Sequence, residues 1–344
     1  MSLIADNRKT LYLTTAGTSV GLDHDALTVR RPESELIRTP LRAVDAIICV
    51  SNVTVSTAAL ARCAQDSIAV SWLTRSGKFR FALRSPKHGN VELRIEQYRC
   101  ATDADRCLDM AKLIVTAKLL NSSVVLFDAA KDRRTQRAKL RSAGEALVRH
   151  ARNAESAPDL DALRGIEGAG AKRYFNEWSA SLIPEGVRFN GRIRRPPLDP
   201  VNAMLSFGYT MLQTRCVGAV EHLGLDPHIG FLHSLRPGRT SLALDLMEEF
   251  RAHSVDRLVL TLLNRRQLVE RDFHHDRVGG CRMTDSGRAA FLAAYDSHQS
   301  GTVTHRAFTQ KVERRKLPDV QALLLSRHLR GDFTRYVPYR AVGR

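Results

Sequence analysis

The hydrophobic pattern of the chain changes near residues 84–90, and this change limits the possible folds more than any other feature. Before it, short runs such as VDAIICV and SIAVSWL stand between polar turns, as is typical of β-strands. After it, apolar residues recur at the spacing of helical turns. One short helix is expected within the first part, where Ser56 can cap STAALARCAQD. We therefore predict an α+β fold, with a small, mainly β N-terminal domain before a larger, mainly α-helical one.

The segment RSPKHGN, residues 84–90, contains Pro, Gly and basic residues that suit a linker. We place the β domain at residues 1–85, the linker at 86–90 and the helical domain at 91–344. A chain of 344 residues is long enough for two domains that each bury a core.

The clearest helical pattern starts at DPVNAMLSFGYTML, where Asp199 can act as N-cap and Pro200 suits the first turn. An apolar stripe runs on from there through Gly208. Further along, RDFHHDRVGGCRMTDSGRAAFL predicts a hairpin around 279–280 and a helix capped near Thr284.

The net charge of +17 makes a polyanion the expected partner, and nucleic acid comes first because each neutralised phosphate releases counterions. No apolar run approaches the roughly 20 residues needed to cross a bilayer, and the first residues lack signal-peptide features. We therefore expect a cytoplasmic protein with no membrane partner. No CxxC pair, P-loop, dinucleotide fingerprint, GxSxG or HExxH motif occurs, which disfavours zinc sites, nucleotide hydrolysis, redox and serine-hydrolase chemistry.

The stretch GFLHSLRPGRTSLALDLMEEFR gathers acids in a basic chain. Asp245 and Glu248 are three residues apart in an expected helix and so share a face. His233 lies before a Pro/Gly loop that can fold its imidazole toward them. Together they can form part of a Mg²⁺ or Mn²⁺ site. The alternative is that the acids are solvated and favour the helix dipole, and that the histidine is structural.

A second candidate is RGIEGAGAKRYFNEWSA, where Glu167 shares a helical face with Tyr174 and Trp178 if the helix includes it. A carboxylate on an apolar stripe indicates a buried acid held for a cation. The alternative is an ordinary acid at a helix start beside flexible glycines.

Two arginine groups are candidates for phosphate contacts, although a solvated basic loop would have the same composition. Arg236 and Arg239 lie between His233 and the acids, and four others precede the long helix: Arg188, Arg192, Arg194 and Arg195. The histidines of FHHD, residues 273–276, are assigned no site.

Three segments, GIEGAGAKRYF, RRPPLDPVNAMLSFGYTML and GFLHSLRPGRTSLALDLMEEFR, resemble in order the CRISPR-associated endonuclease and integrase family, Cas1. The opening TLYLTTAGTSVGLD and CAQDSIAVSWLTRSGKFRFAL also resemble its N-terminal domain, so the resemblance spans most of the chain. The sequence HSLRPGRTSLALDLMEEF is most similar to that of the type I-C branch.

The resemblance implies that Glu167, His233 and Glu248 hold a catalytic Mg²⁺ or Mn²⁺ ion, with Asp245 as an accompanying acid. Some relatives have Asp at the position of Glu248, so which of the two acids touches the metal stays open. The implied reaction is transesterification, in which the 3′ hydroxyl of captured DNA attacks a phosphodiester at the edge of a CRISPR repeat. Tyr209, on the helix side opposite the core stripe, is expected to pack near the nucleotide.

The resemblance also implies the partners. The family works as homodimers, paired through the N-terminal β domain, that clamp Cas2 into a heterohexamer carrying double-stranded DNA, and Cas4 can join to trim ends. Two other hypotheses follow from charge and acids alone: a non-catalytic nucleic-acid-binding scaffold, and a structure-selective DNA repair nuclease that ignores the repeat.

Overall fold

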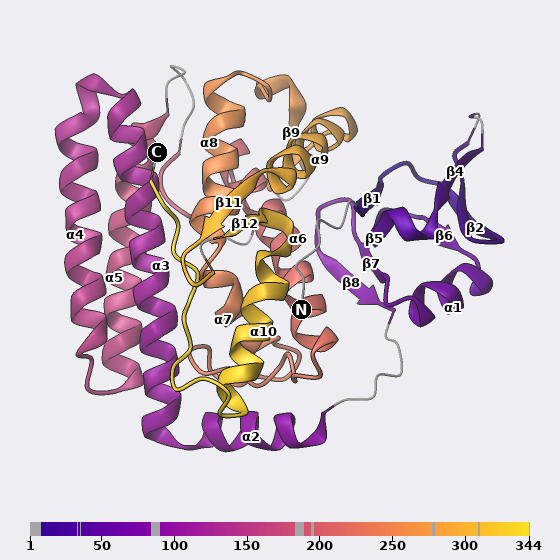
Figure 1. Cartoon of the computed structure of the whole chain (residues 1–344). Coiled ribbons are helices and arrows are strands. Elements are labelled where there is room, and N and C mark those ends of the chain that lie inside the picture. The colour runs from indigo at the N-terminus through magenta and orange to yellow at the C-terminus, as the bar shows by residue number, and fades with distance from the viewer. Residues whose placement is uncertain are drawn as a thin grey trace. The chain divides into compact units, whose positions relative to one another are not determined.

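The computed structural model describes residues 8–32, 34, 36–83, 90–182, 189–193, 196–276, 279–308 and 310–343. It is α+β, with a β-rich region followed by a helical one, which confirms the predicted fold class (Figure 1). The chain divides into two compact units, Met1–His88 and Gly89–Arg344. The predicted linker, residues 86–90, lies outside the described residues except for Asn90.

The N-terminal unit contains two four-stranded sheets. In the first, in the order β1-β5-β7-β8, β5 pairs parallel with β1 and β7, and β8 pairs antiparallel with β7. In the second, in the order β4-β3-β2-β6, β2, β3 and β4 pair as antiparallel neighbours, whereas β6 pairs parallel with β2. The elements of this unit are β1 (Lys9–Leu13), β2 (Ser19–Asp23), β3 (Ala26–Arg30), β4 (Ile37–Pro40), η1 (Leu41–Ala43), β5 (Val44–Val50), β6 (Thr54–Val55), α1 (Thr57–Gln65), β7 (Ala69–Leu73) and β8 (Phe79–Ala82).

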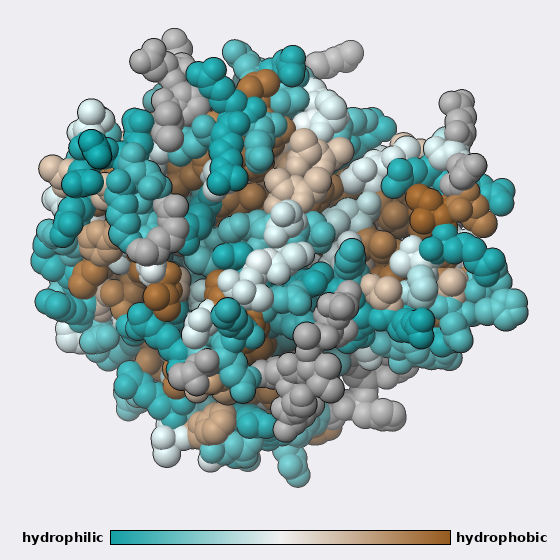
Figure 2. All heavy atoms as spheres, turned by 45° about the horizontal axis from the view of Figure 1, so that its top comes forward, coloured by the Kyte–Doolittle hydropathy of each residue, from teal (hydrophilic) through white to brown (hydrophobic). Residues whose placement is uncertain are grey.

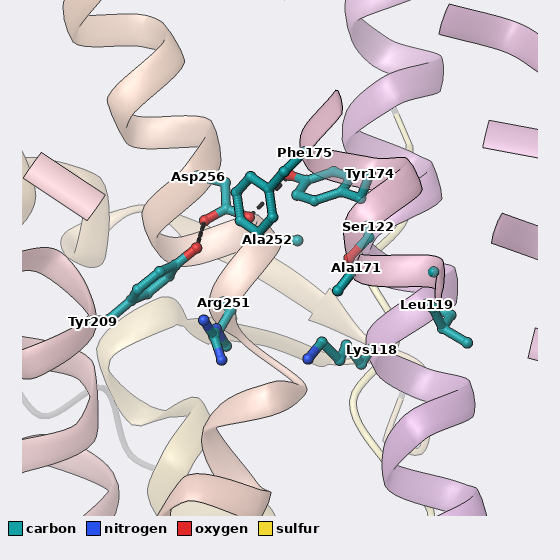
Figure 3. A pocket seen from close by; sticks show the side chains of 11 residues that line it. Lys118, Leu119, Ser122, Ala171, Tyr174, Phe175, Tyr209, Arg251, Ala252 and Asp256 are labelled. Atoms are coloured by element: carbon teal, nitrogen blue, oxygen red, sulfur yellow. Dashed lines mark hydrogen bonds between the residues drawn. The ribbon is translucent and has the colours of Figure 1, made fainter. Parts of the chain in front are cut away.

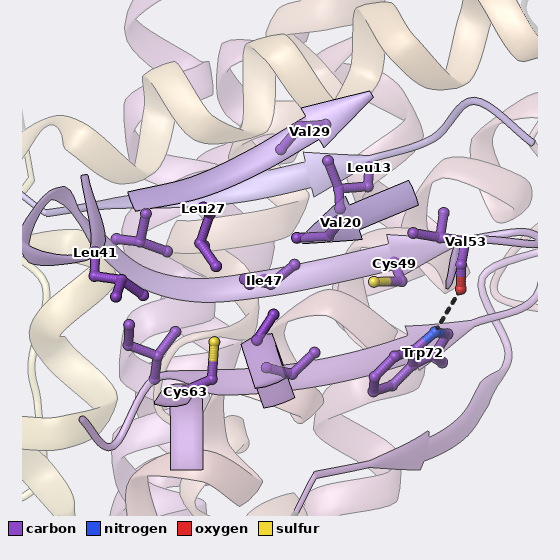
Figure 4. Close-up of a cluster of buried hydrophobic side chains, with 14 residues drawn as sticks. Leu13, Val20, Leu27, Val29, Leu41, Ile47, Cys49, Val53, Cys63 and Trp72 are labelled. Atoms are coloured by element: carbon purple, nitrogen blue, oxygen red, sulfur yellow. Dashed lines mark hydrogen bonds between the residues drawn. The ribbon is translucent and has the colours of Figure 1, made fainter. Parts of the chain in front are cut away.

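Side chains from both sheets and from α1 form the core of this unit (Figure 4). Ile47 on the central strand is fully buried and packs in the cluster with Leu27 and Cys63. Trp72 is mostly buried there, and its indole N–H donates to the carbonyl of Val53 at 3.2 Å. The predicted cap of α1 is confirmed, since the Ser56 hydroxyl accepts from the third backbone N–H after it.

The second unit is mainly helical, and α3, α4 and α5 lie side by side in it (Figure 1). Its elements are α2 (Val91–Thr102), α3 (Ala104–Asp132), η2 (Arg134–Gln136), α4 (Arg137–Glu155), α5 (Leu160–Trp178), η3 (Ser179–Ser181), α6 (Pro200–His222), α7 (Ser241–Glu248), the π-helical turn η4 (Ala252–Asp256), α8 (Arg257–Asn264), η5 (Glu270–Asp272), β9 (Phe273–His275), β10 (Cys281–Met283), α9 (Asp285–Ser300), β11 (Thr302–His305), β12 (Gln310–Glu313), η6 (Arg314–Lys316) and α10 (Leu317–Leu329).

Several local predictions are confirmed in this unit. Asp199 caps α6 through the N–H of Asn202 at 2.8 Å, with Pro200 in the first turn. The predicted hairpin is β9 paired with β10, and Thr284 caps the helix that follows.

α3, with 29 residues, is the longest helix among the described residues, and it is largely apolar. By length and composition it could cross a membrane, the one helix in the described ranges of which this is true. However, 67% of its apolar window is buried inside the fold, which is typical of a core helix. Because α4, α5 and α7 all contact α3, its apolar residues are accounted for by packing.

Candidate functional site

The three proposed metal ligands come from three separate segments of the helical unit. Glu167 lies within α5, His233 lies in the loop between α6 and α7, and Glu248 is the last residue of α7. Glu167 and His233 are partly exposed, whereas Glu248 is 2% exposed. The structure thus places a buried carboxylate next to two side chains that solvent or a substrate can reach.

Asp245 holds the loop that carries His233. Its carboxylate is fully buried and accepts four hydrogen bonds: from the backbone N–H groups of Phe231, Leu232 and His233 at 2.6, 3.0 and 3.0 Å, and from Nδ1 of His233 at 2.6 Å. The loop wraps closely because residue 230 is glycine, where a Cβ atom would lie 2.5 Å from the Asp245 carboxylate. Both oxygens of Asp245 are therefore used in fixing His233.

This arrangement sets the tautomer of His233. An ionised carboxylate only accepts, so in the neutral ring the proton is assigned to Nδ1, which leaves the lone pair on Nε2. Nε2 lies 3.9 Å from a carboxylate oxygen of Glu248. A carboxylate behind a histidine in this way orients the ring for a metal on its other nitrogen. In the structure Asp245 thus lies behind His233, whereas Glu248 faces its free nitrogen.

Glu248 is paired with two cations. Arg251 donates to one oxygen of Glu248 at 2.7 Å, and the Lys118 ammonium lies 2.7 Å from the other. Burial by itself raises the pKa of Glu248, but the charges of Arg251 and then Lys118 outweigh it and hold the pKa well below its usual range. Glu248 is therefore ionised at neutral pH although it is buried.

Lys118 also forms a very short ion pair with Glu167, so its ammonium links two of the proposed ligands. Lys118 is not among the site residues predicted from the sequence. A signal was nevertheless present, because Lys118 is the only charged residue between Lys112 and Asp128, and a lysine in such a run is rarely buried without a partner.

Besides Lys118, Arg251 is a second residue at the site that was not predicted from the sequence. Its guanidinium lies over the ring of Tyr209, 4.2 Å from the centroid, and is paired with Glu248. Arg251 follows Glu248 by three residues, a spacing that brings side chains together on a helix. That spacing could have indicated the pair from the sequence.

Tyr209 is 7% exposed, and its hydroxyl donates to Asp256 (Figure 3). Tyr174 donates to the other oxygen of the same carboxylate at 2.9 Å. Burial raises the pKa of Asp256 to about 6. The expectation that Tyr209 faces away from the core fails because α6 is buried on almost all sides. Its contact with a nucleotide stays a prediction.

The proposed phosphate-binding arginines differ in their exposure and in their hydrogen bonds to other side chains. Arg236 is exposed, and Arg239 is partly exposed and reaches the Ser234 hydroxyl at 3.3 Å. Arg192 is held by Asn202 at 2.8 Å and Ser206 at 2.9 Å. The remaining three, Arg188, Arg194 and Arg195, lie outside the described residues. In Figure 2 the visible face is mostly hydrophilic, with hydrophobic side chains in limited patches.

The described residues contain no cluster of three or more His, Cys, Asp or Glu side chains placed closely enough to hold a metal ion as they stand. The donor set nevertheless suits Mg²⁺ or Mn²⁺, since it offers two carboxylates and one imidazole nitrogen. One oxygen of Glu248 is buried, and the Lys118 ammonium lies 2.7 Å from it. The site therefore fits a cation, and Lys118 supplies the positive charge there.

Known proteins similar to this chain cover most of its length. A family model described as CRISPR associated protein Cas1 matches residues 11–297. The protein named CRISPR-associated endonuclease Cas1 1 from Chlorobaculum tepidum is 39% identical over 334 residues, which cover 96% of this chain and 97% of that protein. A CRISPR-associated exonuclease Cas4/endonuclease Cas1 fusion from Geobacter sulfurreducens is 37% identical, over 95% of this chain and 59% of the fusion.

Solved structures share the fold. A casposase bound to integration product has a TM-score of 0.83 at 24% identity, covering 95% of this chain and 92% of that one. A Cas1 protein from Thermotoga maritima has a TM-score of 0.79 at 26% identity, covering 94% and 97%. A chain of a Cas6-RT-Cas1–Cas2 complex has a TM-score of 0.82 at 22% identity, covering 100% of this chain and 37% of that chain.

Proposed function

Because the chain belongs to the Cas1 family of CRISPR-associated proteins, we propose that it is a metal-dependent DNA endonuclease and integrase of CRISPR adaptation. It would insert short duplex spacers at repeat boundaries by transesterification. The observation that supports this proposal is the set of contacts around Glu248. Lys118 pairs with both Glu167 and Glu248, and Nε2 of His233, whose ring is oriented by Asp245, lies 3.9 Å from Glu248. The likeness to a casposase bound to integration product supports the fold for such a reaction.

The residues would divide the work as follows. Glu167, Glu248 and Nε2 of His233 would hold Mg²⁺ or Mn²⁺, which when bound polarises the target phosphate and offsets charge on its oxygens. Asp245 keeps the imidazole in one tautomer and orientation. Arg251 keeps Glu248 ionised inside the fold.

The reaction itself exchanges one phosphodiester for another. The 3′ oxygen of the spacer forms a bond to phosphorus, the bond from that phosphorus to the 3′ oxygen of the repeat junction breaks, and the proton of the attacking hydroxyl passes through solvent to the leaving oxygen. Arg236 and Arg239, in the loop directly after His233, would contact phosphates next to this junction.

The proposal also includes the binding partners, the oligomeric state and the cellular location. We infer binding of double-stranded DNA, a homodimer paired through the N-terminal unit, and a heterohexamer with Cas2 in the cytoplasm. The Cas6-RT-Cas1–Cas2 complex supports the Cas2 partner, and the Cas4/Cas1 fusion supports a link to Cas4. The proposal of a type I-C-like subtype rests on the amino-acid sequence of residues 233–250.

An integration assay tests the function. Purified protein, with and without Cas2, is given a duplex with free 3′ hydroxyls, a plasmid carrying a repeat, and Mn²⁺ or EDTA. We expect Mn²⁺-dependent joining that Glu167→Ala and His233→Ala abolish while DNA binding persists. Glu145→Ala, on an exposed face of α4, is the matched control and should keep wild-type joining.

The outcomes also separate the alternatives. Salt-sensitive DNA binding with no joining or cleavage under any divalent ion would favour a scaffold. Cleavage or joining that ignores the repeat would favour a repair nuclease. Full activity in both alanine variants would refute the proposed site.

A further inference from the structure

Lys118 occupies an unusual position for a lysine. It lies on α3, the apolar core helix, between the fully buried Ala117 and the almost fully buried Leu119, and its own side chain is 12% exposed. Desolvating an ammonium group is costly unless partners compensate for it. Its partners here are Glu167 from α5 and Glu248 from α7. The lysine thus connects three helices through one charge.

The two carboxylates need such a charge when no metal is bound. Arg251 neutralises only one side of Glu248, at 2.7 Å. Within the described residues, Lys118 is the cation paired with Glu167, and it also lies next to the buried oxygen of Glu248 that has no hydrogen bond. Two carboxylates that share one counter-ion inside a protein repel each other strongly once that ion is lost, because the local dielectric constant is low.

We propose that Lys118 is a positioning residue that acts as a built-in counter-cation: its ammonium bridges Glu167 and Glu248 in the metal-free protein and leaves this bridge when the divalent ion binds. The inference rests on the proposed function, because it assumes that these carboxylates take a metal. The ammonium lies 2.7 Å from a Glu248 oxygen, and a divalent ion bound by the same oxygens would repel it, so both cannot hold that position.

A cavity next to the site gives the displaced side chain a place to go. It has a volume of about 30 Å³, and Lys118 and Arg251 both line it. Figure 3 shows the two cationic groups directed toward the same space, with the carboxylate of Asp256 beyond them. The Ser122 hydroxyl, one turn further along α3, lines the same cavity. Lys118 can therefore shift toward this cavity, where the Ser122 hydroxyl and Asp256 lie among mostly apolar lining groups.

The proposal predicts a competition between ammonium and metal that binding measurements can detect. In Lys118→Met, which keeps the length of the side chain but removes its charge, we expect a lower melting temperature without metal. We also expect the Mn²⁺ dissociation constant, measured from the free-Mn²⁺ paramagnetic resonance signal, to fall about tenfold. The rise in melting temperature on adding Mn²⁺ should be larger than in the wild type.

Two variants keep this test decisive. Lys112→Met, on the same helix and partly buried, should leave both quantities as in the wild type. Lys118→Gln is used beside Lys118→Met and must shift Mn²⁺ affinity in the same direction, so poor folding of one variant does not decide the result. Weaker or unchanged Mn²⁺ binding in the Lys118 variants would overturn the proposal.

Failure of this inference is distinguishable from failure of the proposed function. If wild-type protein binds no Mn²⁺ and joins no DNA, the metal site itself is wrong. If the wild type binds Mn²⁺, Glu167→Ala does not, and the Lys118 variants bind it with wild-type affinity, only the counter-cation role is wrong.

Discussion

At the scale of single residues, Asp245 is the acid whose role the geometry changes most. The sequence left open whether Asp245 or Glu248 touches the metal. With four hydrogen bonds from the loop at residues 231–233, Asp245 has no oxygen to spare. Its contribution is therefore the orientation of His233, and Glu248 is the ligand we propose.

Asp245→Asn tests this division. The new amide NH₂ would face groups that are themselves donors, so the ring of His233 should lose its fixed orientation. We expect Mn²⁺ affinity and joining to fall by about 10- to 100-fold, the usual cost of losing a partner behind a metal-binding histidine. Titration with Mn²⁺ and the integration assay measure this, and wild-type metal affinity in the variant would argue against a positioning role.

His253 links stability to pH. Burial, followed by the charges of Arg257 and Arg314, lowers its pKa to about 3 from 6.5, with His298 also facing it. Its imidazole accepts from Arg314 at 3.1 Å and packs beside the Tyr339 ring. Since the folded protein holds this histidine neutral, its contribution is complete above pH 6.5 and is lost as the pH falls toward 3.

Denaturant unfolding at several pH values checks this linkage. His253→Gln should make the free energy of unfolding fall less steeply between pH 6.5 and 3 than in the wild type. His24→Gln, at an exposed turn, serves as control and should keep the wild-type slope. Equal slopes in wild type and His253→Gln would mean that His253 titrates normally in the folded protein.

At the scale of elements, residues 336–341, after α10, form a strap that is hydrogen-bonded to the helices of the second unit. Glu249, the neighbour of Glu248, is fully buried and accepts from the Tyr336 hydroxyl at 2.5 Å and the Tyr339 backbone N–H at 2.6 Å. Asn121 on α3 donates to the carbonyls of Glu249 and Tyr339 and accepts from the N–H of Ala341. The strap thus fixes the end of α7 against α3.

Removing one strap contact should cost stability. We expect Tyr336→Phe to lower the free energy of unfolding by about 1–3 kcal/mol, because it leaves a buried carboxylate one donor short. Tyr98→Phe, which removes a hydroxyl bonded to Asp226 at the surface, should cost less. Urea unfolding compares the two, and an equal or smaller loss in Tyr336→Phe would contradict the strap.

Elements with local signals were predictable from the sequence, and those held by distant contacts were not. α6 carries its own cap and proline, and the hairpin of β9 and β10 carries paired glycines, so both were predicted. The strap has no periodic pattern, because its backbone bonds to side chains more than 80 residues away. Lys118 was missed for the same reason: its partners lie on other helices.

At the scale of the whole molecule, the charge of +17 predicts DNA binding that weakens with salt. The double variant Arg236→Ala/Arg239→Ala should bind duplex DNA more weakly and reduce the slope of log affinity against log salt by about 2, one for each lost phosphate contact. Its melting temperature should stay near that of the wild type, because neither side chain is buried. An unchanged salt slope, measured by fluorescence anisotropy, would place the phosphate contacts elsewhere.

The most direct measurement is the sequence of the junctions formed when the protein, Cas2 and Mn²⁺ act on a repeat-bearing plasmid and a duplex with 3′ hydroxyl ends. Glu248→Gln, which keeps the shape of the buried side chain but removes its charge, is compared in parallel. We expect wild-type junctions at the repeat boundaries, each joining a spacer 3′ oxygen to a repeat phosphate, and none with Glu248→Gln. Repeat-boundary junctions at the wild-type level from Glu248→Gln, or no junctions from the wild type, would show that these carboxylates and His233 do not form an integrase site.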